Sequence, residues 1–306
     1  MSKRLTIGAA RLAGLVAVPL LAACGGPVQD AAAPSPSAQN APLQAVVATA
    51  ISDQCAPCTV IGKDRRLPLG IVDTNGVPVA DVQVRAQVFS VPAGSAAPSA
   101  VGPVVDAPYH GDLLQGKGVY VLHQTFVQPG IYKVLVQATK GAVSATTEAA
   151  FTVLAADPGI AVGAPAPPTK NQLQSQVKDI STIDTGVPPD DMHYITIASA
   201  LAAHHAMVIF FGSPGFCQTK TCAPEVDVVK KLELTYRPKG VDFVHIETYK
   251  GGRPDAGRTV SDEFNQWKLT SDPWVVVVDR QGRVAGKFDG PTTADEIDPV
   301  VAQVSS

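Results

Sequence analysis

Charge is scarce in this sequence, and so are the features that mark a nucleic-acid-binding protein. Only 17% of the 306 residues are charged, the net charge is −3, and no run of basic residues follows the N-terminal segment. Aromatic residues make up 6% of the chain and are not interleaved with basic ones. Nucleic-acid binding requires a positively charged stretch or face. The composition therefore argues against nucleic acid as a partner.

A hydrophobic run of transmembrane length is missing at the N-terminus. The apolar stretch from Leu12 to Ala23 covers about a dozen residues, whereas a transmembrane helix needs roughly 20. It follows a basic start and ends in Leu-Ala-Ala-Cys-Gly at 21–25, which is typical of an export signal. The ending resembles the lipobox of bacterial lipoproteins, which implies a signal peptide at 1–23 and a lipid on Cys24. An ordinary secretory signal with a chance cysteine is the alternative.

Cysteine is also rare, with five in the chain. If Cys24 carries lipid, four remain as two close pairs, Cys55 with Cys58 and Cys217 with Cys222. An exported protein meets an oxidising environment, where such pairs tend to be disulfides or redox dithiols. We expect a cell-envelope protein held to the extracytoplasmic side of a membrane by its lipid.

The length predicts two folded domains plus extra segments. Residues 24–46 hold mostly Gly, Pro, Ala, Ser and Gln after the cysteine, and are expected to be a flexible tether. Residues 47–156 show short alternating apolar runs separated by turn signals such as Asn75-Gly76. This pattern resembles an immunoglobulin-like β-sandwich, expected to act as a spacer or binding module.

Residues 157–172 are rich in Pro and Gly, and we expect either a linker or an extended arm lying on the next domain. From 173 to 306, apolar strands alternate with helices, which indicates an α/β domain whose sheet is buried on both faces. The expected elements are helix 197–205, strand 207–211, helix 223–236, strand 241–249, helix 261–267, strands 274–279 and 283–288, and helix 295–304.

Three motifs between about 195 and 304 resemble the thioredoxin superfamily. Phe-Phe-Gly-Ser-Pro-Gly-Phe-Cys at 210–217 is an apolar strand entering a loop that ends in cysteine. Asp-Pro-Trp at 272–274 matches the cis-proline that faces the active-site cysteine in that family. Asp-Arg-Gln-Gly-Arg at 279–283 matches the hairpin between its last two strands. The resemblance implies a thioredoxin-like fold and favours thiol–disulfide exchange with a protein or small-thiol partner.

The thiolate is the form of cysteine that attacks a disulfide. A cysteine at the start of a helix lies near unpaired N–H groups and the positive end of the helix dipole, which favour the anion. We therefore predict Cys217 as the nucleophile and Cys222 as the resolving thiol. Lys220 could lower the pKa of Cys217 further, and a cis Pro273 would present backbone to a substrate. Trp274 is expected either to shape a peptide groove or to lie in the core.

Two departures leave alternatives open. Four residues separate the cysteines instead of two, and the strand at 207–211 lacks the buried acid of thioredoxins. The pair could be a structural disulfide in a non-catalytic envelope binding or assembly lipoprotein. A peroxiredoxin-like peroxidase is disfavoured because Phe210 and Pro214 occupy the Pro and Thr/Ser positions of that signature. Copper delivery is disfavoured because no histidine follows His245.

The Cys55/Cys58 spacing suits a redox pair or half of a zinc site, but no nearby residue completes four ligands. We expect a local disulfide in an exposed segment. A more specific hypothesis is that this pair exchanges electrons with Cys217 and Cys222. His204 and His205 are expected at the surface, and His245 buried or half-buried. The sequence predicts no cofactor and no metal site.

Overall fold

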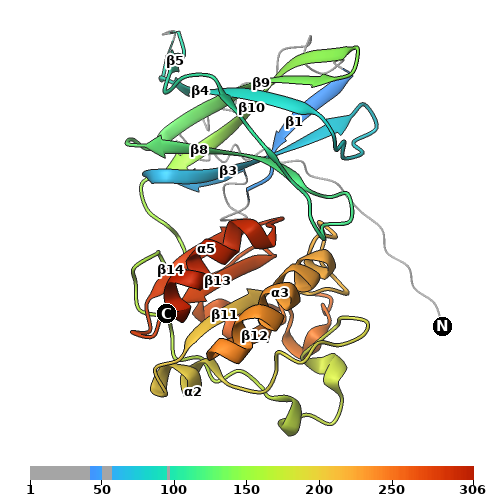
Figure 1. The fold of residues 1–306 in the computed structure, drawn as a ribbon, viewed down its shortest axis with the longest axis vertical. Helices are drawn as coiled ribbons and strands as arrows, with labels where there is room; N and C mark the ends of the chain where they lie inside the picture. The colour runs from blue at the N-terminus through green and yellow to red at the C-terminus, as the bar shows by residue number, and fades with distance from the viewer. Residues whose placement is uncertain (1–41, 50–56, 95–96) are drawn as a thin grey trace, which may run out of the picture. The chain divides into compact units, whose positions relative to one another are not determined.

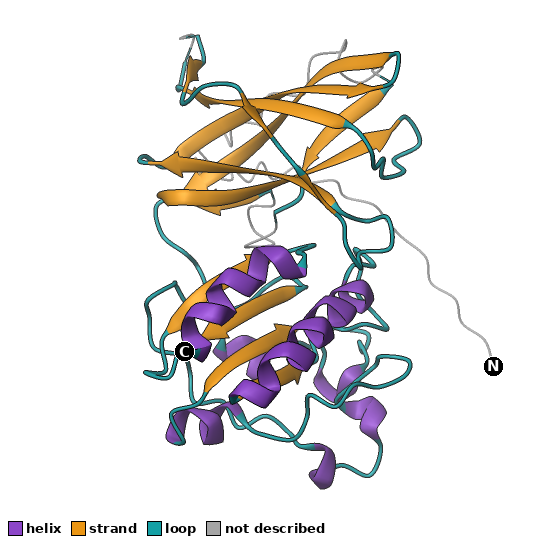
Figure 2. Ribbon diagram, viewed as in Figure 1, coloured by secondary structure: helices purple, strands orange, loops and turns teal. Residues whose placement is uncertain are grey.

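The first part of the chain forms two β-sheets (Figures 1 and 2) in the computed structural model, which describes residues 42–49, 57–94 and 97–306. Its strands are β1 (Leu43–Val47), β2 (Cys58–Val60), β3 (Gly62–Asp73), β4 (Gln83–Val91), β5 (Ser99–Ala100), β6 (Val105–Asp106), β7 (Tyr109–His110), β8 (Val119–Phe126), β9 (Gly130–Lys140) and β10 (Val143–Leu154). One sheet has the order β1-β3-β8-β7, and the other β2-β10-β9-β4-β5 with β6 on β4. Neighbouring strands are antiparallel except β2 and β10.

Alternation of side chains gives these sheets a shared core. Val84, Ala86 and Val88 point inward from β4, since every second residue of a strand lies on the same face. They belong to one buried cluster with Leu67 and Leu69 of the other sheet. The apolar alternation read from the sequence therefore identifies the buried face of these strands.

Two expectations fail at the ends of strands. Strand β1 begins at Leu43, inside the segment expected to be tether, because Leu43 and Ala45 alternate into the core. The alternation of Val143, Ala145, Ala149, Phe151 and Val153 predicts that all five face inward, but Val143 is 43% exposed because it lies beside the turn that opens β10. The predicted signal peptide, Cys24 and the first part of the tether lie outside the described residues.

Residues 157–172 contact the α/β half instead of bridging to it freely. The backbone N–H of Gly163 donates to the carbonyl of Val284 at 2.8 Å, and that of Ala166 to Gly282 at 2.9 Å. Thr169 accepts a hydrogen bond from the indole of Trp267 at 3.0 Å. This segment is therefore an extended arm, the second of the two expectations.

The C-terminal half has one four-stranded sheet in the order β12-β11-β13-β14. Its elements are η1 (Gln174–Gln176), η2 (Ile180–Thr182), α2 (Ile197–Ala202), β11 (Ala206–Phe211), α3 (Cys222–Tyr236), η3 (Arg237–Lys239), β12 (Val241–Ile246), η4 (Lys250–Gly252), α4 (Asp262–Gln266), β13 (Trp274–Val278), β14 (Val284–Asp289) and α5 (Ala294–Ser305). Strands β11 and β12 are parallel, and β13 and β14 are antiparallel to their neighbours. Each helix and strand expected from the sequence forms, within a few residues at its ends.

Both faces of this sheet are covered. On β11, Val208 and Phe210 belong to a cluster with α3 and α5, whereas Met207 and Ile209 belong to a second cluster with α2 and α4. Helices α3 and α5 run side by side over one face, as Figure 1 shows. Continuous apolar strands are what a sheet buried on both faces requires. None of the helices in the described ranges has the length and apolar character to cross a bilayer.

The described residues belong to one compact unit, and Arg66 of β3 joins its two halves. The guanidinium is paired with Glu296 of α5 at 2.6 Å and donates to the backbone carbonyls of Asp289 and Pro291 at 3.0 and 2.6 Å. Both charged side chains are nearly buried. Such charge-assisted hydrogen bonds are roughly twice as strong as neutral ones.

Candidate functional site

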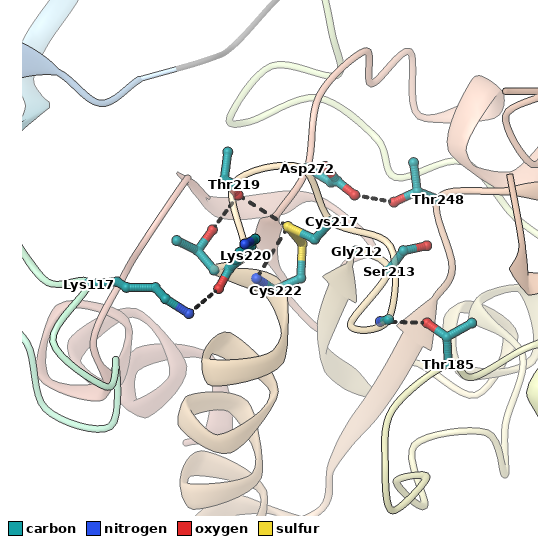
Figure 3. The surroundings of a disulfide bond; sticks show 12 residues. Lys117, Thr185, Gly212, Ser213, Cys217, Thr219, Lys220, Cys222, Thr248 and Asp272 are labelled. Carbon is teal, nitrogen blue, oxygen red and sulfur yellow. Dashed lines mark hydrogen bonds between the residues drawn. A yellow bond between two sulfur atoms is a disulfide. The ribbon is translucent and has the colours of Figure 1, made fainter. Parts of the chain in front are cut away.

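The two cysteines of the C-terminal pair lie between the central strand β11 and the start of α3 (Figure 3). Cys217 and Cys222 form a disulfide, with Cα atoms 5.9 Å apart. Cys222 is the first residue of α3, one residue before the expected start of this helix, while Cys217 lies in the turn before it. The peptide bond between Asp272 and Pro273 is cis.

The surroundings of the two sulfurs differ. Cys217 keeps 8% of its surface exposed, whereas Cys222 is fully buried. The backbone N–H of Cys222 donates to the Cys217 sulfur at 3.4 Å, and the Thr219 hydroxyl lies 3.1 Å from the same sulfur. A helix N-terminus carries unpaired N–H groups and a partial positive charge, which favour a thiolate. Negative charge is therefore best stabilised on Cys217.

An acid missed by the sequence reasoning lies beside the disulfide. One carboxylate oxygen of Asp272 and both cysteine sulfurs all lie within 4.8 Å of one another. Thr248 donates a hydrogen bond to this carboxylate at 2.7 Å (Figure 3). Burial raises the pKa of Asp272, and the hydrogen bonds from Thr248 and the Ser213 backbone oppose the rise. Asp272 is therefore a partly buried carboxyl group within reach of both sulfurs.

The loop that leads to Cys217 is hydrogen-bonded to His245 of β12 and to Glu247, which follows β12. His245 lies 3.0 Å from the carbonyl oxygen of Gly212, and Glu247 accepts a hydrogen bond from the Ser213 hydroxyl. Glu247 also accepts from the backbone N–H of Thr185 at 2.5 Å. Burial raises the pKa of Glu247, although the charge of His245 and these hydrogen bonds counteract it.

His245 is buried, as expected, and both of its ring nitrogens face acceptors. Its Nδ1 lies 2.9 Å from a carboxylate oxygen of Asp190. Burial lowers the pKa of His245, but the hydrogen bond and charge of Asp190, with those of Glu247 and Asp184, outweigh burial and raise the pKa to about 9.

Four buried side chains behind the loop form a set with metal-ligating atoms. They are Asp184, Asp190, His193 and His245. A cavity of about 230 Å³ borders both histidines. Sequence reasoning missed this set because its members are separated by up to 61 residues and come from a loop and a strand.

The other predicted site residues are placed as follows. Trp274 is 2% exposed and belongs to the core cluster on the opposite face of the sheet from the cysteines, so it shapes no groove. Lys220 is exposed, and its carbonyl accepts from Lys117 at 2.6 Å. His204 and His205 are exposed, as expected.

Cys58 is buried and disulfide-bonded, while Cys55 lies outside the described residues. The expected exposed segment is therefore wrong at Cys58. Cys58 belongs to the buried cluster on one face of the α/β sheet, whereas Cys217 and Cys222 belong to the cluster on the other. The sheet therefore lies between Cys58 and the C-terminal cysteine pair.

No protein-family model matches the chain. No curated protein matches it either. Among solved structures, it is similar to a thiol:disulfide interchange protein of the thioredoxin family from Chlorobium tepidum TLS, with 19% identity, a TM-score of 0.33, and 48% of this chain and 99% of the other covered. A candidate thiol:disulfide interchange protein DsbE from Chlorobium tepidum is 13% identical with a TM-score of 0.35, and the match covers 48% of this chain and 99% of the other. MTB dsbF is 17% identical with a TM-score of 0.28, and the match covers 42% of this chain and 99% of the other. The structural neighbours are thus thioredoxin-family disulfide interchange proteins, matched over about half of this chain.

Proposed function

We propose that this chain is a cell-envelope thiol–disulfide oxidoreductase in which Cys217 attacks and Cys222 resolves. The observation that carries the proposal is the hydrogen bond from the backbone N–H of Cys222, at the N-terminus of α3, to the Cys217 sulfur. In the reduced protein this donor and the helix dipole favour a thiolate at Cys217. The partial exposure of Cys217, against none for Cys222, supports Cys217 as the attacking residue.

The proposed reaction consists of two thiol–disulfide exchange steps. The Cys217 thiolate attacks one sulfur of a partner disulfide, forming a mixed disulfide and releasing one partner thiolate, which takes a proton from water. Asp272 accepts the proton of the Cys222 thiol, and the resulting thiolate attacks the Cys217 sulfur. The second partner thiolate leaves, and two electrons have passed from the dithiol to the partner. The oxidised protein runs the same steps in reverse against a partner dithiol.

Burial of the disulfide supports a second candidate function. A structural disulfide is buried and inert, and only 8% of Cys217 is exposed. The competing function is a non-catalytic envelope binding or assembly protein with a thioredoxin-like scaffold. In both cases the N-terminal sheets would form an immunoglobulin-like spacer or binding module.

The reduction potential of the Cys217–Cys222 pair separates the two functions. The full chain is equilibrated in glutathione or dithiothreitol buffers, its thiols are alkylated, and the peptide carrying both cysteines is quantified by mass spectrometry. We expect a potential between about −120 and −270 mV, the range of exchange catalysts. A value below about −300 mV would mean a structural disulfide and favour the scaffold.

Membrane attachment is part of the proposal. The basic start, the short apolar run and the Leu-Ala-Ala-Cys-Gly ending support export, cleavage after residue 23 and lipidation of Cys24. We expect the chain in the membrane fraction of cells and the Cys24→Ser variant in the soluble or unprocessed fraction. An unchanged distribution of that variant would contradict the lipid anchor.

A further inference from the structure

Four buried polar side chains lie behind the loop that carries the cysteines. Asp184, Asp190 and His193 come from the segment between η2 and α2, and His245 comes from β12. Their side chains are at most 3% exposed, and each offers one ligand atom within 4.8 Å of the others. Carboxylates and imidazoles are almost never gathered in a protein interior without a partner charge or a metal.

Each histidine nitrogen of the set faces one oxygen of each carboxylate, and the two histidines face different oxygens. His193 Nε2 lies 3.4 Å from a carboxylate oxygen of Asp184 and 3.4 Å from one of Asp190. His245 Nδ1 lies 2.9 Å from Asp190 and 4.0 Å from Asp184. Bonds of about 2.0–2.1 Å in a tetrahedral zinc site place neighbouring ligand atoms roughly 3.3–3.4 Å apart. The four pairs bracket this separation.

His193 provides an independent observation. Its Nε2 is buried and makes no hydrogen bond, although it faces both carboxylates. An imidazole nitrogen buried in this way normally has a partner. A cation between the ring and the carboxylates would supply one.

The atoms around the set hold it in a ligating orientation. His245 Nε2 lies 3.0 Å from the Gly212 carbonyl, so that nitrogen donates its hydrogen and Nδ1 points toward the carboxylates. The carboxylate of Asp184 accepts from the backbone of Gly186 at 2.7 Å, and that of Asp190 from the backbone of Met192 at 2.9 Å. Metal-binding histidines typically donate their second N–H to a carbonyl, and ligating carboxylates are themselves hydrogen-bonded.

We propose that Asp184, Asp190, His193 and His245 form a site for a divalent first-row transition-metal ion, with Zn²⁺ the best fit to two nitrogen and two oxygen donors. The cavity of about 230 Å³ that borders both histidines gives the ion an entry path. The bound ion would fix the Gly212 loop through His245. The proposal does not depend on the chemistry of the cysteines.

Zinc titration of the oxidised full chain tests the site. Isothermal titration calorimetry with Zn²⁺ is expected to give one ion per chain for the wild type. The His193→Ala variant should bind at least about tenfold more weakly, while His204→Ala, which removes an exposed histidine, should bind as the wild type does. No binding to the wild type, or equal binding to His193→Ala, would overturn the proposal.

A measurement on the wild type guards against misfolding of the variant. Zinc K-edge absorption spectroscopy of the one-to-one complex should show nitrogen and oxygen neighbours at about 2.0–2.1 Å, with the outer-shell pattern of imidazole. A sulfur neighbour at about 2.3 Å would place the ion at a cysteine and refute the assignment.

Discussion

Among single residues, the two cysteines of the C-terminal pair have different surroundings, which supports the unequal roles proposed for them. The Cys217 sulfur accepts the N–H at the start of α3, while Cys222 is fully buried beneath it. A thiolate on Cys222 would therefore lack both solvent and that N–H donor. The resolving step needs a group that removes its proton, and Asp272 is close enough to do so.

Replacing Asp272 by Asn should slow the resolving step about 10²-fold, the usual contribution of a positioned base. Only the ionised carboxylate accepts the proton, so the wild-type rate should rise with pH through the pKa of Asp272, which burial raises. This rise should be missing in the variant. Stopped-flow mixing of the reduced protein with a chromogenic disulfide measures the lifetime of the mixed disulfide.

The variant should be at least as stable as the wild type at pH 7. A carboxyl whose pKa is raised on folding stabilises the protein below its unfolded pKa, and this contribution is lost as pH rises through the folded pKa. Asn removes that loss at pH 7 and can still accept from Thr248. Asp262→Asn, at an exposed position, is the control. A mixed disulfide that resolves equally fast in Asp272→Asn would rule out Asp272 as the base.

Among the elements, α3 carries the site at its N-terminus and a second buried acid in its first turn. Glu225 is fully buried, accepts one hydrogen bond from the backbone of Thr292 at 3.0 Å, and has a second carboxylate oxygen without a partner. Burial raises its pKa well above the ordinary value, against the opposing effects of Thr292 and Arg66. Glu225 thus joins α3 to the loop before α5 through its hydrogen bond from Thr292.

The Glu225→Gln variant should be more stable than the wild type at pH 8, by about 1 kcal/mol, because Gln is neutral in both the folded and the unfolded protein and so loses no stability to ionisation at high pH. Since the folded pKa is raised, wild-type stability is highest below the unfolded pKa and falls as pH rises through the folded one. Urea unfolding at pH 5 and pH 8 measures both effects.

Asp227→Asn on the exposed side of the same helix is the matched control and should leave the pH dependence unchanged. A Glu225→Gln protein that loses stability by the same amount as the wild type between pH 5 and pH 8 would contradict a raised pKa.

In the whole molecule, the N-terminal sheets contribute directly to the surroundings of the disulfide. Leu114, in the loop between β7 and β8, is fully buried in the same cluster as Cys217 and Cys222. Lys117 of this loop donates to the Lys220 carbonyl between the cysteines (Figure 3). The loop therefore covers the buried side of the site and couples its exposure to the β-sheet half.

Leu114→Ala should lower the free energy of unfolding by about 2–5 kcal/mol, the usual cost of this truncation in a core. The cavity it opens should also speed reduction of the disulfide by dithiothreitol. Urea unfolding and timed alkylation measure the two effects. Leu113→Ala, at the neighbouring position with 39% exposure, should change little. Equal effects of the two variants would mean that the loop does not cover the site.

Local patterns predicted the secondary structure of this protein well. Apolar alternation located the inward faces of β4 and β9, and continuous apolar runs located β11 and β13. A strand buried on one face alternates apolar and polar residues, whereas a strand buried on both faces is apolar throughout. Such patterns fail at a strand end that is exposed, as at Val143. They also fail where a segment distant in the sequence buries a residue, as at Cys58.

Only those residues of the candidate site that lie in short sequence motifs could be predicted. Cys217, Cys222 and Pro273 stand in recognisable motifs, and the structure brings the cysteines together at the helix start. Asp272 could have been suspected from its place before the proline, but nothing local signals that its carboxylate reaches the sulfurs.

The sequence by itself determined the order of the elements, the cysteine pair and its place before a helix, because hydrophobic period and motif spacing act over a few residues. Tertiary structure alone decided the acid beside the disulfide, the set of Asp184, Asp190, His193 and His245, the burial of Trp274 and the cover provided by Leu114. These four features depend on which distant segments pack together. Electrostatic interactions and burial are set by neighbours in space, whereas sequence patterns contain information only about neighbours along the chain.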